Sequence, residues 1–487
     1  MIELNGNDIE YLKEFGLDKQ TVDRQYQQFV DGIAPVSLVA PANPESGILR
    51  FSEPQLTNFE NYFDEYSPNI QISRFVPASG AASRMFKSFF QFLESGTEDQ
   101  EIEIFANGLN SFAFYNQIKC NNETDYRCAI DKMLNELKLA DLPKALIPFH
   151  SYHSTSRTAF EEHLVESALI LADNNDINIH FTISKAHKEL FTELMEKLPL
   201  LSASASAHFA ITFSYQSHAT DTIAVDSDNQ LVRNEDGSIM LRPGGHGSLL
   251  MNLNDLTADL IFVKNIDNVQ PDHLKVETVL YKKILAGYLV STQGEIKDNL
   301  LKLENENSDL TKAQHFVENE LNIRIPESYN RLDSMEKRNF LRTKLNRPMR
   351  VCGMVKNEGE PGGGPFWIRN TSGDESLQIV EASQIDMQDE QQVDIFQQSS
   401  YFNPVDLVCW IKDYQGNKFD LNKFTDRDAS FISDKSQAGK TFKVLEHPGL
   451  WNGAMADWIT LFVEVPIATF SPVKRVTDLL RPQHQPA

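Results

Sequence analysis

The chain has 487 residues, of which 41% are hydrophobic, so it is long enough for two or three packed units and global disorder is not expected. It carries 69 acidic and 45 basic residues, and the resulting net charge of −24 argues against nucleic acid or anionic lipid as partners. No apolar run reaches the roughly 20 residues of a membrane span, and the start shows no signal-peptide pattern, so we expect a cytoplasmic protein.

The first 70 residues read as an accessory segment of helices and loops, with one helix starting near Glu53. A short strand over residues 72–75 follows and runs into the turn "PASGAAS". Residues 88–142 show apolar spacing near 3.6, which predicts a helical insertion. From residue 70 to 270 strand and helix patterns then alternate, and a helix is expected after Thr158, which forms a capping box with Glu161. This alternation predicts an α/β domain with a largely parallel sheet.

Charged helical segments are expected over residues 275–345, and the last part mixes strands with short helices. We therefore expect an accessory segment at 1–70, an α/β domain at 71–400 with its helical insertion at 88–142, and a C-terminal α+β part at 401–487. The four cysteines form no CxxC pair, so the sequence predicts neither a disulfide framework nor a zinc site. They are Cys120, Cys128, Cys352 and Cys409.

Three predicted strand ends carry unusual residues, and ligands of open α/β sheets bind at the carboxyl ends of strands. The turn at residues 79–82 is built of small residues, so its N–H groups could approach a phosphate, with Arg84 and Lys87 close behind. The alternative is a tight structural turn with solvated cations. The second end, "RPGGHG", places His246 among glycines; the alternative is a flexible hairpin. The third, "NIDN", offers Asp267 as an oxygen ligand for Mg²⁺ or as the cap of a loop.

These motifs, in this order, resemble those of the UDP-sugar pyrophosphorylases, which have the GT-A-like (nucleotide-diphospho-sugar transferase) fold. In that family a strand, a glycine-rich turn, an Arg and a Pro-Lys pair come first, and here the pair corresponds to "PK" at residues 143–144. A strand ending in Gln follows, then a Gly-His-Gly loop and an Asn-x-Asp-Asn strand end. The final segment "VEVPIATFSPVKRVTDLL" is similar to the family's closing motif. The turn here has one glycine where the family has several.

The resemblance implies a nucleotidyltransferase that forms an NDP-sugar and pyrophosphate from a nucleoside triphosphate, UTP by analogy, and a sugar 1-phosphate. It implies Mg²⁺ at Asp267 as the cofactor, and no general base, because the attacking phosphate is already ionised. The implied phosphate-handling cations are Arg84, Lys474 and one or both of Lys87 and Lys144. The implied nucleotide contacts are Ser79, Gly80, Ala81, Gln216, Gly244 and Gly245, and the implied sugar-phosphate contacts are His246, Glu381 and Asn403.

Two other readings stay open. One is a catalytically silent nucleotide- or sugar-nucleotide-binding protein of the same fold, which the single glycine of the first turn favours. The other is a glycosyltransferase of similar fold, although that class usually carries an Asp-x-Asp pair at a strand end and none is well placed here. The resemblance covers residues 70–480 and fits a divergent bacterial family without an assigned activity.

Overall fold

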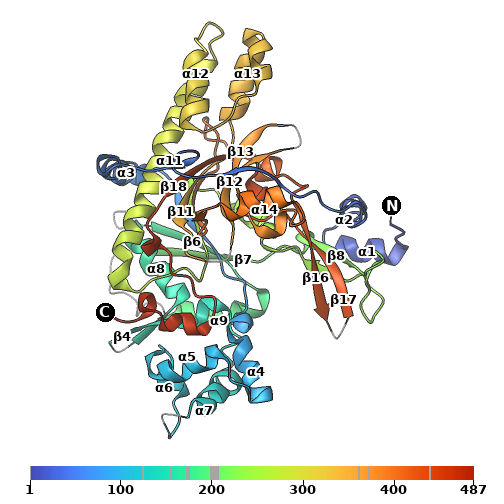
Figure 1. The fold of residues 1–487 in the computed structure, drawn as a ribbon, viewed down its shortest axis with the longest axis vertical. Helices are drawn as coiled ribbons and strands as arrows, with labels where there is room; N and C mark the ends of the chain where they lie inside the picture. Colours follow the sequence, from blue (N-terminus) through green and yellow to red (C-terminus); the bar gives the residue numbers. More distant parts are fainter. Residues whose placement is uncertain are drawn as a thin grey trace. The chain divides into compact units, whose positions relative to one another are not determined.

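The computed structural model describes residues 2–122, 125–153, 155–171, 176–197, 208–359, 362–370, 373–437 and 440–487 (Figure 1). The chain forms two compact units, each assembled from three segments. The first unit comprises Met1–Ser52, Gln216–Asp259 and Leu289–Glu464, and the second comprises Glu53–Tyr215, Leu260–Tyr288 and Val465–Ala487. The last 23 residues therefore belong to the same unit as the first strand end singled out in the sequence.

The second unit contains a parallel sheet in the order β10-β3-β6-β7. These strands span Leu260–Lys264, Ile72–Pro77, Asp176–Thr182 and His208–Ser214. Strands β3 and β10 are buried almost throughout, as expected for parallel strands that are covered on both faces. A hairpin of β4 (Pro148–Tyr152) and β5 (Thr155–Thr158) completes the strands described in this unit.

The helices of the second unit include a cluster of four, α4 to α7, that is inserted after β3 (Figure 1). The sequence predicted helices over residues 88–142, where these four lie. The helices are α3 (Glu53–Tyr66), α4 (Lys87–Ser95), α5 (Gln100–Gly108), α6 (Tyr115–Ile118), α7 (Tyr126–Asp131), α8 (Ala159–Ile170), α9 (Lys188–Lys197) and the start of α11 (Lys275–Leu303). Helix α8 begins with the expected capping box between Thr158 and Glu161.

The first unit contains three sheets. In the largest, β2, β18 and β11 are parallel, and β15 and β14 pair antiparallel with β11. A three-stranded antiparallel sheet has the order β1-β12-β13, and a four-stranded one has the order β16-β17-β8-β9. The strands are β1 (Ser37–Pro41), β2 (Ile48–Leu49), β8 (Asp221–Val225), β9 (Leu241–Pro243), β11 (Met349–Lys356), β12 (Gly364–Arg369), β13 (Glu375–Val380), β14 (Tyr401–Phe402), β15 (Asp406–Trp410), β16 (Phe431–Gln437), β17 (Lys440–Glu446) and β18 (Ile459–Glu464).

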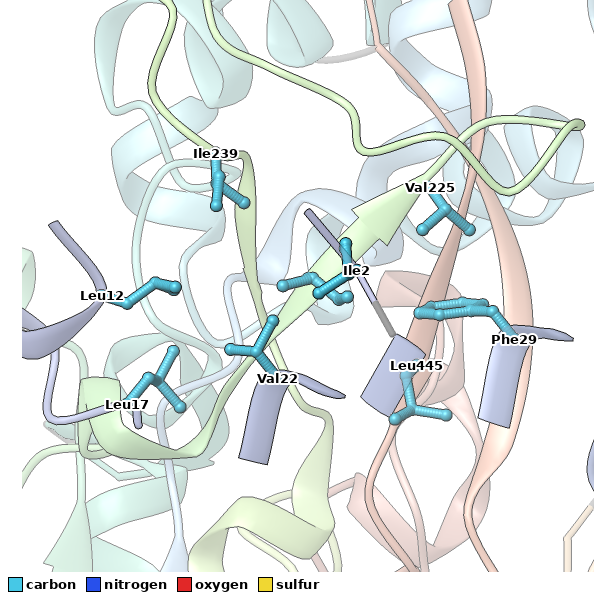
Figure 2. Packing of buried hydrophobic residues seen from close by; sticks show 9 residues of the cluster. Ile2, Leu12, Leu17, Val22, Phe29, Val225, Ile239 and Leu445 are labelled. Carbon is cyan, nitrogen blue, oxygen red and sulfur yellow. The ribbon is translucent and has the colours of Figure 1, made fainter. Parts of the chain in front are cut away.

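Helices α1 and α2 of the first unit are held against the four-stranded sheet by a hydrophobic cluster, drawn in Figure 2. Val22 and Phe29 come from α2, and Val225 and Leu445 come from β8 and β17. The helices of this unit are α1 (Gly6–Glu14), α2 (Lys19–Asp31), α10 (Leu250–Asp255), α12 (Thr311–His315), α13 (Ser334–Leu345), α14 (Glu390–Gln397) and the end of α11. In the described part of the chain, no helix is both long and apolar enough to cross a membrane.

Two sequence predictions need correction. The strand at residues 221–225 does not join the parallel sheet but lies antiparallel between β9 and β17, because its partners come from later segments that local periodicity does not report. The cysteines were expected to form no disulfide, but Cys120 and Cys128 are bonded to each other, with Cα atoms 6.4 Å apart. Helices α6 and α7 of the insertion bring these two residues together, whereas Cys352 and Cys409 are buried in strands β11 and β15.

Candidate functional site

The end of strand β10 presents a buried carboxylate. The fully buried strand leads into the turn of residues 265–268, in which the Asn268 N–H donates to the Asn265 carbonyl at 3.2 Å. Asp267 in this turn is 6% exposed. Because β10 and β3 are parallel neighbours, their carboxyl ends meet at one edge of the sheet.

Two lysines from distant parts of the sequence contact that carboxylate. Lys144 Nζ lies 3.0 Å and Lys474 Nζ 2.9 Å from Asp267 Oδ2. Burial raises the pKa of Asp267, but the two ammonium groups outweigh this effect and hold the pKa below its ordinary value. The carboxyl group is therefore ionised at neutral pH, and the three side chains together carry one net positive charge. The Lys474 side chain is 53% exposed, so part of this charge faces solvent.

Lys144 reaches the site because its segment packs on the small-residue turn after β3. The Lys144 N–H donates to the Gly80 carbonyl at 3.2 Å, and Ala81 forms a bridge with Pro143. The helical insertion thus begins and ends at one point, and the Pro-Lys pair that follows it lies beside the turn. Ser79 is half-buried, and Gly80 and Ala81 are exposed at this turn.

The other two predicted cations of this region lie just beyond the turn. Arg84 lies in a short 3-10 segment, Ala82–Phe86, and is exposed. Lys87 is the first residue of α4 and is also exposed. Of the two lysines between which the sequence could not choose, Lys144 is the one in contact with Asp267.

Lys474 is held in place by the backbone around it. The Lys474 and Arg475 N–H groups both donate to Asp478 Oδ2 at 2.7 Å, so Asp478 fixes the turn of the "PVKRVTD" segment. The Val473 N–H donates to the Asp267 carbonyl at 3.0 Å, and Lys144 Nζ donates to the Val473 carbonyl at 3.0 Å. Main chain and side chains therefore tie the last segment to the end of β10.

A buried polar network anchors the end of the same segment, and sequence reasoning missed it. His150 Nδ1 lies 2.9 Å from Glu162 Oε1, and His150 Nε2 lies 2.9 Å from His484 Nδ1. The three side chains are buried, and Glu162 also pairs with Lys275. Burial lowers the pKa of both histidines, that of His484 to about 3, so both rings are neutral. The sequence signal was a histidine four residues after the end of the predicted closing motif, but its partner could not be inferred.

A second buried cluster supports the strands beneath Asp267. Glu166 accepts from Arg74 Nη2 at 2.6 Å and from Lys264 Nζ at 2.9 Å, and all three side chains are at most 3% exposed. Lys264 is the last residue of β10 and Arg74 lies in β3. His163 Nε2 lies 3.2 Å from the Ile266 carbonyl, next to Asp267. Helix α8 thus fixes the carboxyl end of β10 and the middle of β3.

The remaining predicted residues lie in the first unit, where His246 belongs to a small cluster. Its ring stacks on Trp451 with centroids 4.4 Å apart, and its Nδ1 accepts from the Leu450 N–H at 3.1 Å. Burial lowers the pKa of His246 to about 4, so the ring is neutral. Burial raises the pKa of Glu381, and a hydrogen bond with Trp451 opposes the rise, so Glu381 and His246 both contact the same indole.

The glycines beside His246 are required by their surroundings. Gly245 has φ +75°, and a Cβ atom there would lie 2.7 Å from Glu446 Oε2. A Cβ atom on Gly244 would collide with the His447 ring. The loop is therefore packed tightly against residues 446–447, which favours a fixed loop over a flexible hairpin.

Asn403 and Gln216 have simpler surroundings. Asn403 is buried, and its Oδ1 accepts from the Val405 N–H at 3.1 Å, which supports the positive φ of Val405. This contact gives Asn403 a structural role at the loop before β15. Gln216 is half-buried and follows the end of β7 by two residues.

Comparisons with solved structures show a shared fold. UDP-N-acetylglucosamine pyrophosphorylase from Trypanosoma brucei, solved with an inhibitor, aligns over 94% of this chain and 74% of its own, with a TM-score of 0.50 and 11% identity. A variant of UDP-glucose pyrophosphorylase from Leishmania major, solved with UDP-glucose, aligns over 98% of this chain and 79% of its own, with a TM-score of 0.45 and 11% identity. The likeness to the first of these shows a mixed α/β fold with a mostly parallel sheet and confirms the resemblance seen in the motifs.

Comparisons of the sequence itself give a family but no curated relative. None of the curated proteins matches the chain. The profile of one family, described as "Domain of unknown function (DUF4301)", matches residues 5–485. This match covers nearly the whole sequence, and the chain therefore belongs to the DUF4301 family.

Proposed function

We propose that this chain is a sugar-1-phosphate nucleotidyltransferase with a variant of the GT-A-like fold. The observation that carries the proposal is the contact of Lys144 and Lys474 with Asp267. In a chain with a net charge of −24, these three side chains make a local excess of positive charge at the edge of a parallel sheet. Such an excess suits a phosphate-rich substrate.

In the proposed reaction, an oxygen of the sugar 1-phosphate attacks the α-phosphorus of the nucleoside triphosphate, with UTP as the proposed substrate. The new P–O bond forms as the bond between the α-phosphorus and the bridging oxygen breaks, and pyrophosphate carries away the electron pair. Both reactants are anions, so the enzyme must align them and compensate their charge. Alignment alone can lower a barrier by roughly 7–11 kcal/mol.

Roles for the residues of the second unit follow from this chemistry. Lys474, the more exposed of the two lysines, would neutralise the reacting phosphate, and Lys144 would share the charge from beside the turn. Arg84 and the N–H groups of residues 79–81 would hold the triphosphate, and Lys87 would remain peripheral to it. The buried Glu166 cluster would fix the strand ends rather than touch the substrate.

Roles for the residues of the first unit rest on the resemblance and on their local contacts. Gln216 would read the base, and the backbone of Gly244 and Gly245, held in place by residues 446–447, would contact the nucleotide. His246 would contact the sugar phosphate as a neutral ring, since burial keeps its pKa at about 4. Glu381 shares the Trp451 contact with His246 and would bind a sugar hydroxyl. Asn403, already committed to its own loop, would shape the pocket without touching the sugar.

In the proposed reaction, magnesium would arrive bound to the nucleoside triphosphate. Among the described residues no group of three or more His, Cys, Asp or Glu side chains could hold a metal ion. Asp267 offers a single carboxylate, and Mg²⁺ bound to nucleotides often takes one or two carboxylates plus phosphate oxygens and water. The donor set therefore fits an ion that arrives with the triphosphate. When bound, Mg²⁺ would offset the charge of the phosphate oxygens.

The direct test is a product assay with a panel of nucleoside triphosphates and sugar 1-phosphates in the presence of Mg²⁺. Pyrophosphate release is followed continuously, and mass spectrometry identifies the sugar nucleotide. The proposal expects both products in equal amounts, and none without Mg²⁺. Nucleotide binding without turnover across the panel would favour a silent binding protein. Sugar transfer from a sugar nucleotide to an acceptor would favour a glycosyltransferase.

A further inference from the structure

A cavity of about 230 Å³ in the first unit is roofed by one face of helix α2. Thr21, Arg24, Gln25 and Gln28 line it, at the three- and four-residue spacing that places side chains on one side of a helix. The rest of its wall comes from residues 219–220, from the loop that follows β9 and the start of α10, and from residues within 422–430, 445–448 and at 454. Gly247 and Ser248 of the Gly-Gly-His-Gly loop are part of that wall.

The roof is fixed rather than loosely attached. Val22 and Phe29, on the other face of α2, pack into the hydrophobic cluster shown in Figure 2. Gln25 Oε1 accepts from the Ile223 N–H at 3.1 Å, and Gln28 Nε2 donates to the Arg427 carbonyl at 3.3 Å. The cavity is therefore a built feature of this unit.

The charge in the cavity is unbalanced. Arg24, Arg427 and His447 line it, and no aspartate or glutamate does so among the residues that the structure describes. Within the same described part of the chain, neither guanidinium group has a hydrogen-bond or ion-pair partner. Burial lowers the pKa of His447 and the charge of Arg24 lowers it further, whereas the hydrogen bond with the Thr220 carbonyl and the charge of Asp221 oppose this effect.

Polar groups of the wall are also left without partners. Ser248 is 2% exposed, and its Oγ has no hydrogen-bond partner among the described residues. Buried polar atoms normally find one, so the hydroxyl group has a donor to offer to a bound group. Thr21 and Asn422 add polar side chains around the same space.

We propose that this cavity binds the phosphate group of a small phosphorylated metabolite. Guanidinium groups bind phosphate oxygens through paired, charge-assisted hydrogen bonds. The two arginines and the Ser248 hydroxyl group supply donors, and the nearest carboxylates, Asp18 for Arg24 and Asp221 for His447, do not line the cavity. The proposal goes beyond the transferase function and does not depend on it, since Arg24, Arg427 and Ser248 have no role in that function.

The test is isothermal titration of the full-length protein with inorganic phosphate and, in a second arm, with a hexose 6-phosphate. Four proteins are compared: the wild type, the double variant Arg24→Gln/Arg427→Gln, the control Arg331→Gln, and Lys474→Ala. Arg24, Arg427 and Arg331 are all exposed, so loss of folding is not expected. A further variant, Ser248→Ala, tests the hydroxyl group separately.

The proposal expects the double variant to bind at least about tenfold more weakly, because charge-assisted hydrogen bonds are lost. Arg331→Gln should bind phosphate like the wild type. Lys474→Ala should still bind phosphate at the cavity, even if binding near residue 474 is lost. Tighter binding of the hexose 6-phosphate than of phosphate would identify a phosphate ester as the ligand; the reverse would identify the free ion. Unchanged binding in the double variant, or binding lost only in Lys474→Ala, would overturn the proposal.

Discussion

The buried Glu166 cluster provides a quantitative test of how the candidate site is supported. Glu166→Gln keeps the shape of the side chain but removes the charge that lies between Arg74 and Lys264. Both cations would then remain buried, with side chains at most 3% exposed. Lys264 is the last residue of β10, and His163, which lies in α8 like Glu166, contacts the Ile266 carbonyl. Loss of the Glu166 charge should therefore also destabilise the turn that carries Asp267.

The expected size follows from the distances. Two unit charges about 3 Å apart attract by about 5 kcal/mol at an effective dielectric constant of about 20, and desolvation offsets part of this attraction. Removing one member of a buried pair typically lowers the free energy of unfolding by about 3–5 kcal/mol, because the partner charge stays behind. We expect a loss in this range. In the double variant Glu166→Gln/Lys264→Met only Arg74 stays buried without its partner charge. The free energy of unfolding should therefore fall by less than in Glu166→Gln.

Urea unfolding, followed by circular dichroism, measures this difference. The pH dependence gives a second check: burial raises the pKa of Glu166, but Arg74 and Lys264 outweigh it and hold the pKa well below its ordinary value. The stabilisation is therefore complete above the unfolded-state pKa of about 4.3 and is lost as the pH falls further. The difference in free energy of unfolding between the wild type and Glu166→Gln should therefore become smaller at acid pH. A loss below about 1 kcal/mol at neutral pH would refute the reasoning.

Two further predictions concern the second unit and helix α11. Gly287→Ala would place a Cβ atom against the Phe59 carbonyl and should lower the free energy of unfolding by about 1–3 kcal/mol. The matched control Gly294→Ala, with open space around the new atom, should raise it by about 0.5–1 kcal/mol; equal effects in urea unfolding would contradict this account. His484 has a folded-state pKa of about 3 against about 6.5 when unfolded, so the unfolded state binds its proton first and stability falls as the pH drops through that window. His484→Phe should therefore show a flatter dependence of melting temperature on pH between 7 and 5, and an unchanged slope would speak against the buried neutral pair.

The short-range features of the site could be predicted from the sequence. The apolar run before Asp267 and the turn residues around it carry their own signal, and so does the capping box at Thr158. The motif order also led to a mixed α/β fold with a mostly parallel sheet, as the structure has it, because the resemblance depends on residue types at strand ends. The Pro-Lys pair at 143–144 was predicted to be a delayed counterpart of the family's pair, and its segment packs beside the turn.

Long-range pairings could not be predicted. The antiparallel partner of β8 is β17, more than two hundred residues later, and no local pattern encodes that choice. The partnership of His150 with His484 is equally distant. The arginine pair of the cavity escaped notice for the same reason, since Arg24 and Arg427 look like ordinary surface charges until α2 is placed over the loop that follows β9. The Cys120–Cys128 bond depended on helix packing within the insertion.

The central claim is that Lys474 handles a reacting phosphate, and turnover by Lys474→Ala tests it most directly. Pyrophosphate release is measured for the wild type, for Lys474→Ala and for the control Lys188→Ala, an exposed lysine at the start of α9. The account predicts a fall in kcat of about 100-fold or more for Lys474→Ala, as for the loss of one group that stabilises transition-state charge, with the control unaffected. Full turnover by Lys474→Ala, in a protein that keeps its melting temperature, would contradict the account.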